Sequence, residues 1–166
     1  VCYGQSDIPA VPNTSEQLTQ LQAQLPNNPS VFSSPLQRCT SLALQVFPAT
    51  PIRLAPLLIE LNFGAWELTP WHLIARTDLD NWAADPFEFA PPQGESFADV
   101  CQRVQLFVQN FLSPDSPAVL FTHAGVIKAF LYLYAGLSIN AALRHSAPFA
   151  SVTQVQLIAD SLVSKI

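Results

Sequence analysis

Short apolar runs alternate along this chain with segments in which apolar residues recur at helical spacing. The runs at 30–33, 52–54 and 119–121 are short and apolar enough to form buried strands. The segment 97–111 carries its apolar residues at intervals of three and four, which is typical of an amphipathic helix. The pattern therefore predicts strands and helices in alternation.

Further segments extend this alternation. Helices are expected at 15–25, 35–46, 69–75, 78–84, 126–135 and 139–144. The apolar stretch 57–61 is expected to be extended, and the alternating pattern at 153–158 predicts a final strand. Suitable capping residues flank the helices: Thr14 or Ser15, Ser34 and Ser96 at N-termini, and Gly136 at a C-terminus.

The length and order of these elements predict the fold class. The 166 residues contain no internal repeat, low-complexity tract or linker, so we expect a single domain over residues 1–166. Strands that alternate with helices favour an α/β fold, a three-layer α-β-α sandwich around a mostly parallel sheet.

Composition excludes several classes of partner and site. Only 11% of residues are charged and the net charge is −5, so no basic stripe for nucleic acid is expected. Cys2, Cys39 and Cys101 are widely spaced without a Cys-x-x-Cys pair, which favours a reducing, cytoplasmic compartment. No His/Asp/Glu cluster has ligand spacing, so we expect neither a metal nor a cofactor.

Neither the N-terminus nor the longest apolar stretch of the sequence suggests a membrane protein. The N-terminus lacks the basic and apolar regions of a signal peptide. The apolar stretch 118–143 is interrupted by His123, Lys128 and Asn140. A buried strand followed by a buried helix explains that stretch better than a membrane span, so no membrane partner is expected.

His123 stands where the predicted strand 119–121 gives way to a helix. In an open α/β sheet this is the carboxyl edge, where ligands bind, and the N–H groups of the following helix favour an anion there. His123 is therefore a candidate for phosphate chemistry. A hydrogen-bonded interior histidine is the equally weighted alternative.

Arg38 and Glu60 are the other candidates. Arg38 lies in the first turn of a predicted helix, where a cation opposes the helix dipole but where a guanidinium can hold phosphate oxygens. Glu60 is surrounded by apolar residues, so burial would raise its pKa towards a useful acid/base range. The alternative for Arg38 is a solvated surface arginine, and the alternative for Glu60 is a strand residue that faces outward. Glu67 is expected to be solvated, and Glu95 with Arg103 to be a structural pair or part of the site.

Four short motifs follow one another along this chain. They are Ser33-Ser-Pro-Leu-Gln-Arg38, Glu60-Leu-Asn-Phe-Gly64 with Trp66-Glu67, Gly94-Glu-Ser96 with Arg103, and Thr122-His-Ala-Gly125. In this order they resemble the motifs of the histidine phosphatase family, which includes the phosphoglycerate mutases, and the resemblance covers essentially the whole chain. Within the family, 2–9 and 91–96 look most like α-ribazole-5′-phosphate phosphatases of late cobalamin synthesis.

The resemblance implies a phosphatase that acts on a small phosphorylated substrate through a phosphohistidine intermediate. Glu60 would protonate the leaving alcohol and then activate water. Arg38 and His123 would hold the phosphoryl oxygens, and Tyr3 and Gly4 would line the pocket. This arrangement matches what two successive displacements at phosphorus require.

One departure from the family pattern is serious. The family's nucleophilic histidine lies in an Arg-His-Gly or Arg-His-Thr motif at the end of its first strand, and the chain contains neither motif. Arg144-His145-Ser146 falls too late to replace it, and His72 is expected at the surface or rim. We therefore expect the first strand to lie upstream of Val1, this chain to be inactive alone, and its exposed sheet to favour poor solubility or a homodimer.

Two hypotheses follow. The first is a phosphomonoester hydrolase whose nucleophile is absent from this chain. The second is a non-catalytic phospholigand-binding protein, or pseudophosphatase, on the same fold. An unrelated α/β domain would not bring Arg38, Glu60 and His123 into one cavity.

Overall fold

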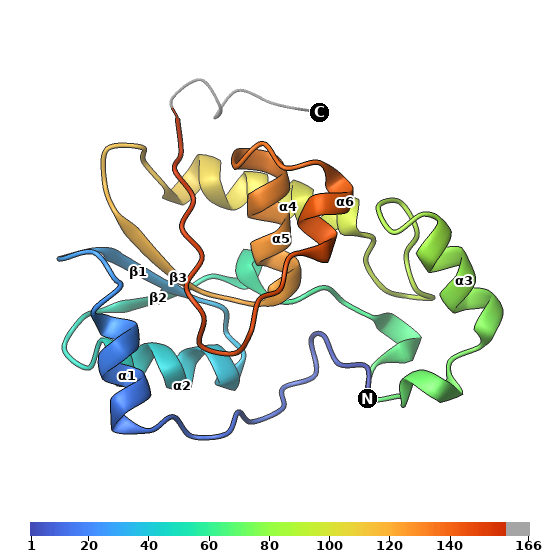
Figure 1. The fold of residues 1–166 in the computed structure, drawn as a ribbon, viewed down its shortest axis with the longest axis horizontal. Helices are drawn as coiled ribbons and strands as arrows, with labels where there is room; N and C mark the ends of the chain where they lie inside the picture. Colours follow the sequence, from blue (N-terminus) through green and yellow to red (C-terminus); the bar gives the residue numbers. More distant parts are fainter. Residues whose placement is uncertain (159–166) are drawn as a thin grey trace.

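A three-stranded parallel sheet forms the centre of the molecule. The computed structural model describes residues 1–158 and contains β1 (Ser30–Ser33), β2 (Ile52–Leu54) and β3 (Ala118–Phe121). The strands lie in the order β2-β1-β3, with Phe32 of β1 opposite Arg53 on one side and Leu120 on the other (Figure 1). All three strands follow the sequence prediction closely because each is a short apolar run bounded by turn residues.

Helices cover both faces of this sheet. Short 3₁₀ turns occur at Pro56–Leu58, Gly64–Trp66 and Trp71–Leu73. The α-helices are α1 (Ser15–Gln22), α2 (Gln37–Val46), α3 (Arg76–Ala84), α4 (Phe97–Phe111), α5 (Ala124–Tyr134) and α6 (Ile139–Arg144).

Alternate strand residues enter two separate cores, which confirms the three-layer α/β sandwich. Val31 and Val119 pack with α1 and α2 on one face. Phe32 points to the other face, where its ring meets Phe107 of α4 edge-on at a centroid distance of 5.2 Å. Because successive strand side chains point to opposite faces, one short strand serves both layers.

Several predicted boundaries differ from the structure. Helix α1 ends at Gln22 rather than residue 25, because the N–H groups of Gln24 and Leu25 bond three residues back in tighter turns before Pro26. The stretch 57–61 is not wholly extended, since Pro56–Leu58 forms a 3₁₀ turn. The expected helix at 69–75 is reduced to the 3₁₀ turn Trp71–Leu73.

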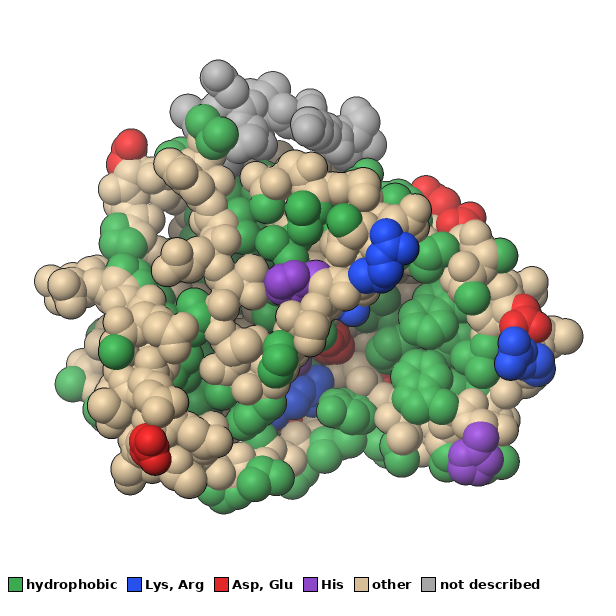
Figure 2. All heavy atoms as spheres, viewed as in Figure 1, with side chains coloured by type: hydrophobic (Ala, Val, Ile, Leu, Met, Phe, Trp, Pro, Cys, Tyr) green, Lys and Arg blue, Asp and Glu red, His purple; other side chains and the backbone are tan. Residues whose placement is uncertain are grey.

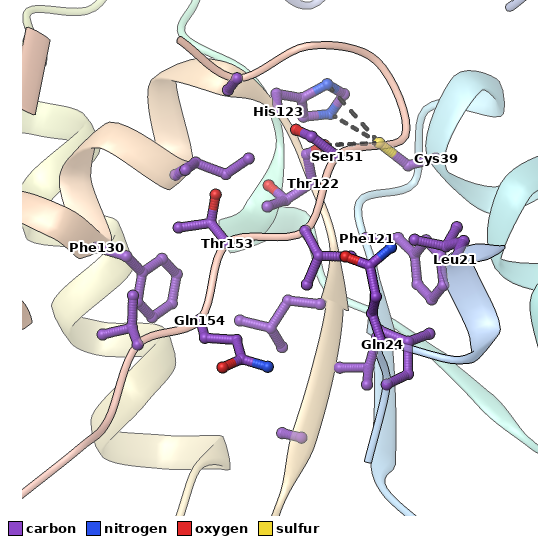
Figure 3. Close-up of a pocket in the computed structure, with 18 of the residues that line it drawn as sticks. Leu21, Gln24, Cys39, Phe121, Thr122, His123, Phe130, Ser151, Thr153 and Gln154 are labelled. Carbon is purple, nitrogen blue, oxygen red and sulfur yellow. Dashed lines mark hydrogen bonds between the residues drawn. The ribbon is translucent and has the colours of Figure 1, made fainter. Parts of the chain in front are cut away.

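The predicted strand at 153–158 is wrong. Residues 153–157 adopt no regular helix or strand and run across the molecule on the opposite side of a cavity from β3 (Figures 1 and 3). Its alternating Val155 and Leu157 pack instead against the helical core that contains Phe107. The alternation thus reflects one-sided burial and not a strand ladder. Among the described residues, β3 consequently pairs along one edge only, with β1.

No helix within residues 1–158 is both long and apolar enough to cross a membrane.

Candidate active site

The candidate site lies at the carboxyl ends of β1 and β3. Strand β1 ends at Ser33 and leads to Ser34 and Arg38, while β3 ends at Phe121 and leads to His123. Because the two strands are parallel neighbours, these polar side chains reach the same edge of the sheet. His123 is the N-cap residue of α5, so the helix begins at the site.

Hydrogen bonds hold both ring nitrogens of His123. Nδ1 accepts a hydrogen bond from Nε of Arg38 at 3.1 Å, so Nε2 carries the proton and faces the Ser34 hydroxyl at 2.8 Å. Burial lowers the pKa of His123 to about 3, and the positive charges of Arg38 and Arg103 act in the same direction. His123 is therefore a neutral donor at physiological pH. The Cys39 sulfur lies 3.5 Å from Nε2 (Figure 3).

The Arg38 guanidinium connects α2 to the N-terminal loop. Its Nη1 donates to the Ser6 carbonyl at 2.9 Å, and its Nη2 donates to the Gly4 carbonyl. Its Cζ atom lies 5.6 Å from the centre of the Tyr3 ring. The structure thus brings Tyr3 and Gly4, both predicted to line the site, into contact with Arg38.

The residue that caps the N-terminus of α2 is not the predicted one, and the difference affects the candidate site. Ser34 does not cap the helix, because Leu36 is the N-cap residue and makes no side-chain cap. Instead, the Asp7 carboxylate accepts a hydrogen bond from the Gln37 N–H at 2.7 Å. This contact leaves the Ser34 hydroxyl facing His123, and it ties the N-terminal loop to α2.

Glu60 faces the N-terminus of α5. Its carboxylate oxygens accept hydrogen bonds from the Gly125 N–H at 3.1 and 3.2 Å, and Oε1 also accepts from the Leu61 N–H at 2.9 Å. Burial raises the pKa of Glu60, and these hydrogen bonds with the charges of Arg103 and Arg38 offset only part of that effect. A methyl group at position 125 would lie 2.3 Å from Oε1, so any larger residue there would displace the Glu60 carboxylate.

Arg38, Glu60 and His123 line one cavity of about 970 Å³, together with Tyr3. The same cavity continues along β3 to the segment 149–157 (Figure 3). Charged and histidine side chains are visible in a hollow near the centre of the face in Figure 2. This convergence excludes the unrelated α/β domain in which the three residues would lie apart.

Glu67 is the residue that sequence reasoning missed. It is not solvated: its carboxylate accepts hydrogen bonds from five donors, the N–H groups of Gly4, Gln5, Ser6 and Phe63 and the Ser6 hydroxyl. Burial raises the pKa of Glu67, but these hydrogen bonds outweigh burial and hold the pKa at about 2. The carboxylate therefore orders the loop whose carbonyls hold Arg38.

The remaining polar candidates lie outside the cavity lining. Glu95 and Arg103 form an ion pair at 3.1 Å with side chains 23% and 12% exposed, and Glu95 also accepts from the Asn62 N–H. Of the two alternatives that the sequence left open for this pair, these contacts favour the structural one. His72 is exposed on the turn Trp71–Leu73, and His145 follows α6. Within residues 1–158, no three His, Cys, Asp or Glu side chains are grouped to hold a metal ion.

Comparison with known proteins agrees with this geometry. Residues 1–165 match the sequence model of the Histidine phosphatase superfamily (branch 1). The chain belongs to this superfamily. A phosphoglycerate mutase from Thermus thermophilus is 33% identical, with a TM-score of 0.65 over 80% of this chain and 74% of that one. The mycobacterial glucosyl-3-phosphoglycerate phosphatase Rv2419c is 25% identical, with a TM-score of 0.68 over 84% and 74%.

Curated relatives include much longer proteins. The bifunctional protein Rv2228c of Mycobacterium tuberculosis is 29% identical over 81% of this chain. The matched region spans only 39% of that protein. The similar proteins include a mutase and a phosphatase of known structure and a putative phosphoserine phosphatase from Hydrogenobacter thermophilus.

Glu67 predicts a pH dependence of folding. Because its pKa is lower in the folded state than in the unfolded chain, Glu67 stabilises the fold above pH 4.5 and this contribution is lost as the pH falls towards 2. Urea unfolding of the wild type should therefore show a steeper loss of stability between pH 4.5 and 2 than Glu67→Gln. Glu88→Gln, at an exposed position, should keep the wild-type slope. Parallel profiles for all three proteins would contradict this role.

Proposed function

We propose that the site hydrolyses small phosphomonoesters through a phosphohistidine intermediate. The observation that carries this proposal is the meeting of Arg38, His123 and Glu60 in one cavity at the carboxyl edge of the sheet. Two of these side chains donate to an anion, and the third is a carboxyl group whose pKa is raised by burial. Donors for phosphoryl oxygens and a tuned acid/base group are what phosphoryl transfer requires from a protein.

Each side chain has a distinct task in this chemistry. The guanidinium of Arg38 leaves the neutral carbonyls of Gly4 and Ser6 for a phosphoryl dianion, which is the stronger acceptor. His123, neutral and protonated at Nε2, turns from Ser34 to a phosphoryl oxygen. In the first displacement an imidazole nitrogen bonds to phosphorus, the ester P–O bond breaks, and Glu60 gives its proton to the departing alkoxide. Water then attacks phosphorus, Glu60 takes a proton from it, and the P–N bond breaks to release phosphate.

The nucleophilic histidine is proposed to lie on a strand upstream of Val1, as the family resemblance implies. Two observations support a place for this strand: β3 pairs along one edge only within the described residues, and the cavity follows its other side. A strand parallel to β3 in that cavity would end beside His123. His123 itself is a poor nucleophile, because Arg38 and Ser34 engage both of its ring nitrogens.

The substrate class follows from the resemblance and the relatives. A small phosphorylated alcohol is the general proposal, and α-ribazole 5′-phosphate of cobalamin synthesis is the specific candidate, supported by the likeness of residues 2–9 and 91–96. The three cysteines are buried and free, which agrees with a cytoplasmic location. No cofactor, nucleic acid or membrane takes part in this proposal.

The decisive assay compares this chain with the protein expressed from its complete gene. We expect the complete protein to hydrolyse p-nitrophenyl phosphate and the 166-residue chain to be inactive. Glu60→Gln in the complete protein should lower steady-state turnover by 10²-fold or more, because acid/base catalysis typically contributes about 10²–10⁴-fold. The exposed Glu88→Gln is the control. Turnover by the 166-residue chain, lost on Glu60→Ala, would overturn the assignment of the nucleophile.

A non-catalytic phospholigand-binding function is the second candidate. The observation that favours it is that Arg38 and Ser34 engage both ring nitrogens of His123, so among the described residues this cavity has no histidine free to act as nucleophile. Saturable phosphate binding by the complete protein, without turnover of any phosphomonoester, would establish this function in place of hydrolysis.

The free edge of β3 also predicts self-association of the isolated chain. Within residues 1–158 no strand pairs with the outer edge of β3, and an open strand edge favours pairing with a second copy. Sedimentation velocity over a hundredfold concentration range should show a monomer–dimer equilibrium for the 166-residue chain. The complete protein should not dimerise through this edge of β3, because the proposed upstream strand would cover it. A chain that stays monomeric throughout would rule out the homodimer.

A further inference from the structure

A cluster of aromatic side chains lies beside the candidate active site and has no task in the proposed chemistry. The segment from Phe63 to Phe89 supplies all of its members. They are Phe63, Trp66, Trp71, Trp82 and Phe89, and we call them the aromatic wall.

Ring contacts fix the geometry of this wall. Trp71 and Trp82 stack with centroids 6.0 Å apart and planes at 8°. Phe63 meets both indoles edge-on, at 5.9 and 6.1 Å. The buried Trp66 meets Trp82 edge-on, with ring centroids 5.9 Å apart, and stacks on Phe89. Offset stacks and edge-to-face contacts are the favoured arrangements of aromatic rings, so the wall is preorganised.

The wall leaves a large apolar surface open to solvent. Trp71 is 39% exposed although it is among the largest side chains in the protein, and Leu73 on the same turn is 67% exposed. In Figure 2, hydrophobic side chains gather next to the hollow that contains the charged groups, on the side of α3. Exposed apolar surface of this kind marks a place where a ligand or partner is bound.

The wall is continuous with the site that holds the phosphoryl group. An added methyl group on Gly4 would lie 2.8 Å from Cδ2 of Phe63, so the Phe63 ring packs directly against Gly4. The Gly4 carbonyl accepts a hydrogen bond from Arg38. Tyr3, half exposed, lies over the same guanidinium. A group attached to a phosphate held by Arg38 would therefore have aromatic surface nearby on the Gly4 side of the guanidinium.

We propose that the aromatic wall binds a planar ring in the alcohol portion of the substrate, with Trp71 as the main specificity determinant. The proposal rests on the proposed function only for the position of the phosphoryl group. The turn Trp71–Leu73 and its neighbours at 68–74 carry no Asp, Glu, Lys or Arg, and His72 is the one ionisable side chain among them, so the surface favours an apolar ring over a second charged group. A saturated ring of equal size gains burial there but no stacking.

Binding of phosphonates to the complete protein separates stacking from simple burial. Benzylphosphonate and cyclohexylmethylphosphonate have the same number of carbon atoms and the same anionic group. In calorimetric titration, benzylphosphonate should bind about fivefold more tightly than cyclohexylmethylphosphonate. Trp71→Ala should bring the two affinities together and leave the affinity for methylphosphonate unchanged. Trp71→Phe should restore part of the preference, and Leu73→Ala, on the same exposed turn, should keep all of it.

The possible failures are distinguishable. If the complete protein hydrolyses neither benzyl phosphate nor ethyl phosphate but keeps the preference for benzylphosphonate, the proposed function fails and the ring site stands. If hydrolysis occurs but wild type binds both seven-carbon phosphonates equally, or Trp71→Ala keeps the wild-type ratio, the ring site is overturned. Absence of binding by any phosphonate also overturns it.

Discussion

The carboxylate of Glu67 is the contact on which the candidate site depends. Five donors converge on it from the N-terminal loop and from Phe63, and they hold its pKa at about 2. The loop so ordered presents the carbonyls of Gly4 and Ser6 to Arg38, and Arg38 in turn donates to His123. One partly buried carboxylate thereby links the start of the chain to both strand ends at the carboxyl edge of the sheet.

Two neighbouring groups acquire opposite protonation tendencies from their surroundings. Burial and nearby cations keep His123 neutral, whereas burial raises the pKa of Glu60. The separation of acid/base tendencies within one cavity is typical of catalytic sites. The parallel sheet makes this possible, because it brings residues from distant parts of the chain to one edge while its two faces are covered by apolar cores.

Local signals predicted much of this structure, and long-range contacts account for what they missed. The strands at 30–33 and 52–54 and the Ser96 cap of α4 depend on neighbouring residues, so the sequence pattern was sufficient. Arg38, Glu60 and His123 were found because each is polar in an apolar setting. Glu67 and Asp7 could not be found this way, because their partners lie up to 63 and 30 residues distant. The strand predicted at 153–158 is wrong because one-sided packing against helices gives the same alternation of apolar and polar residues as a strand does.

The most direct test of the account is the position of an oxyanion in a crystal structure of the complete protein with vanadate or phosphate. The account predicts an anion bonded to the Arg38 guanidinium and to His123 Nε2, with the Glu60 carboxyl facing it and with a histidine from outside this chain on the opposite side. An anion bound elsewhere, with Arg38 still bonded to the carbonyls of Gly4 and Ser6, would contradict it.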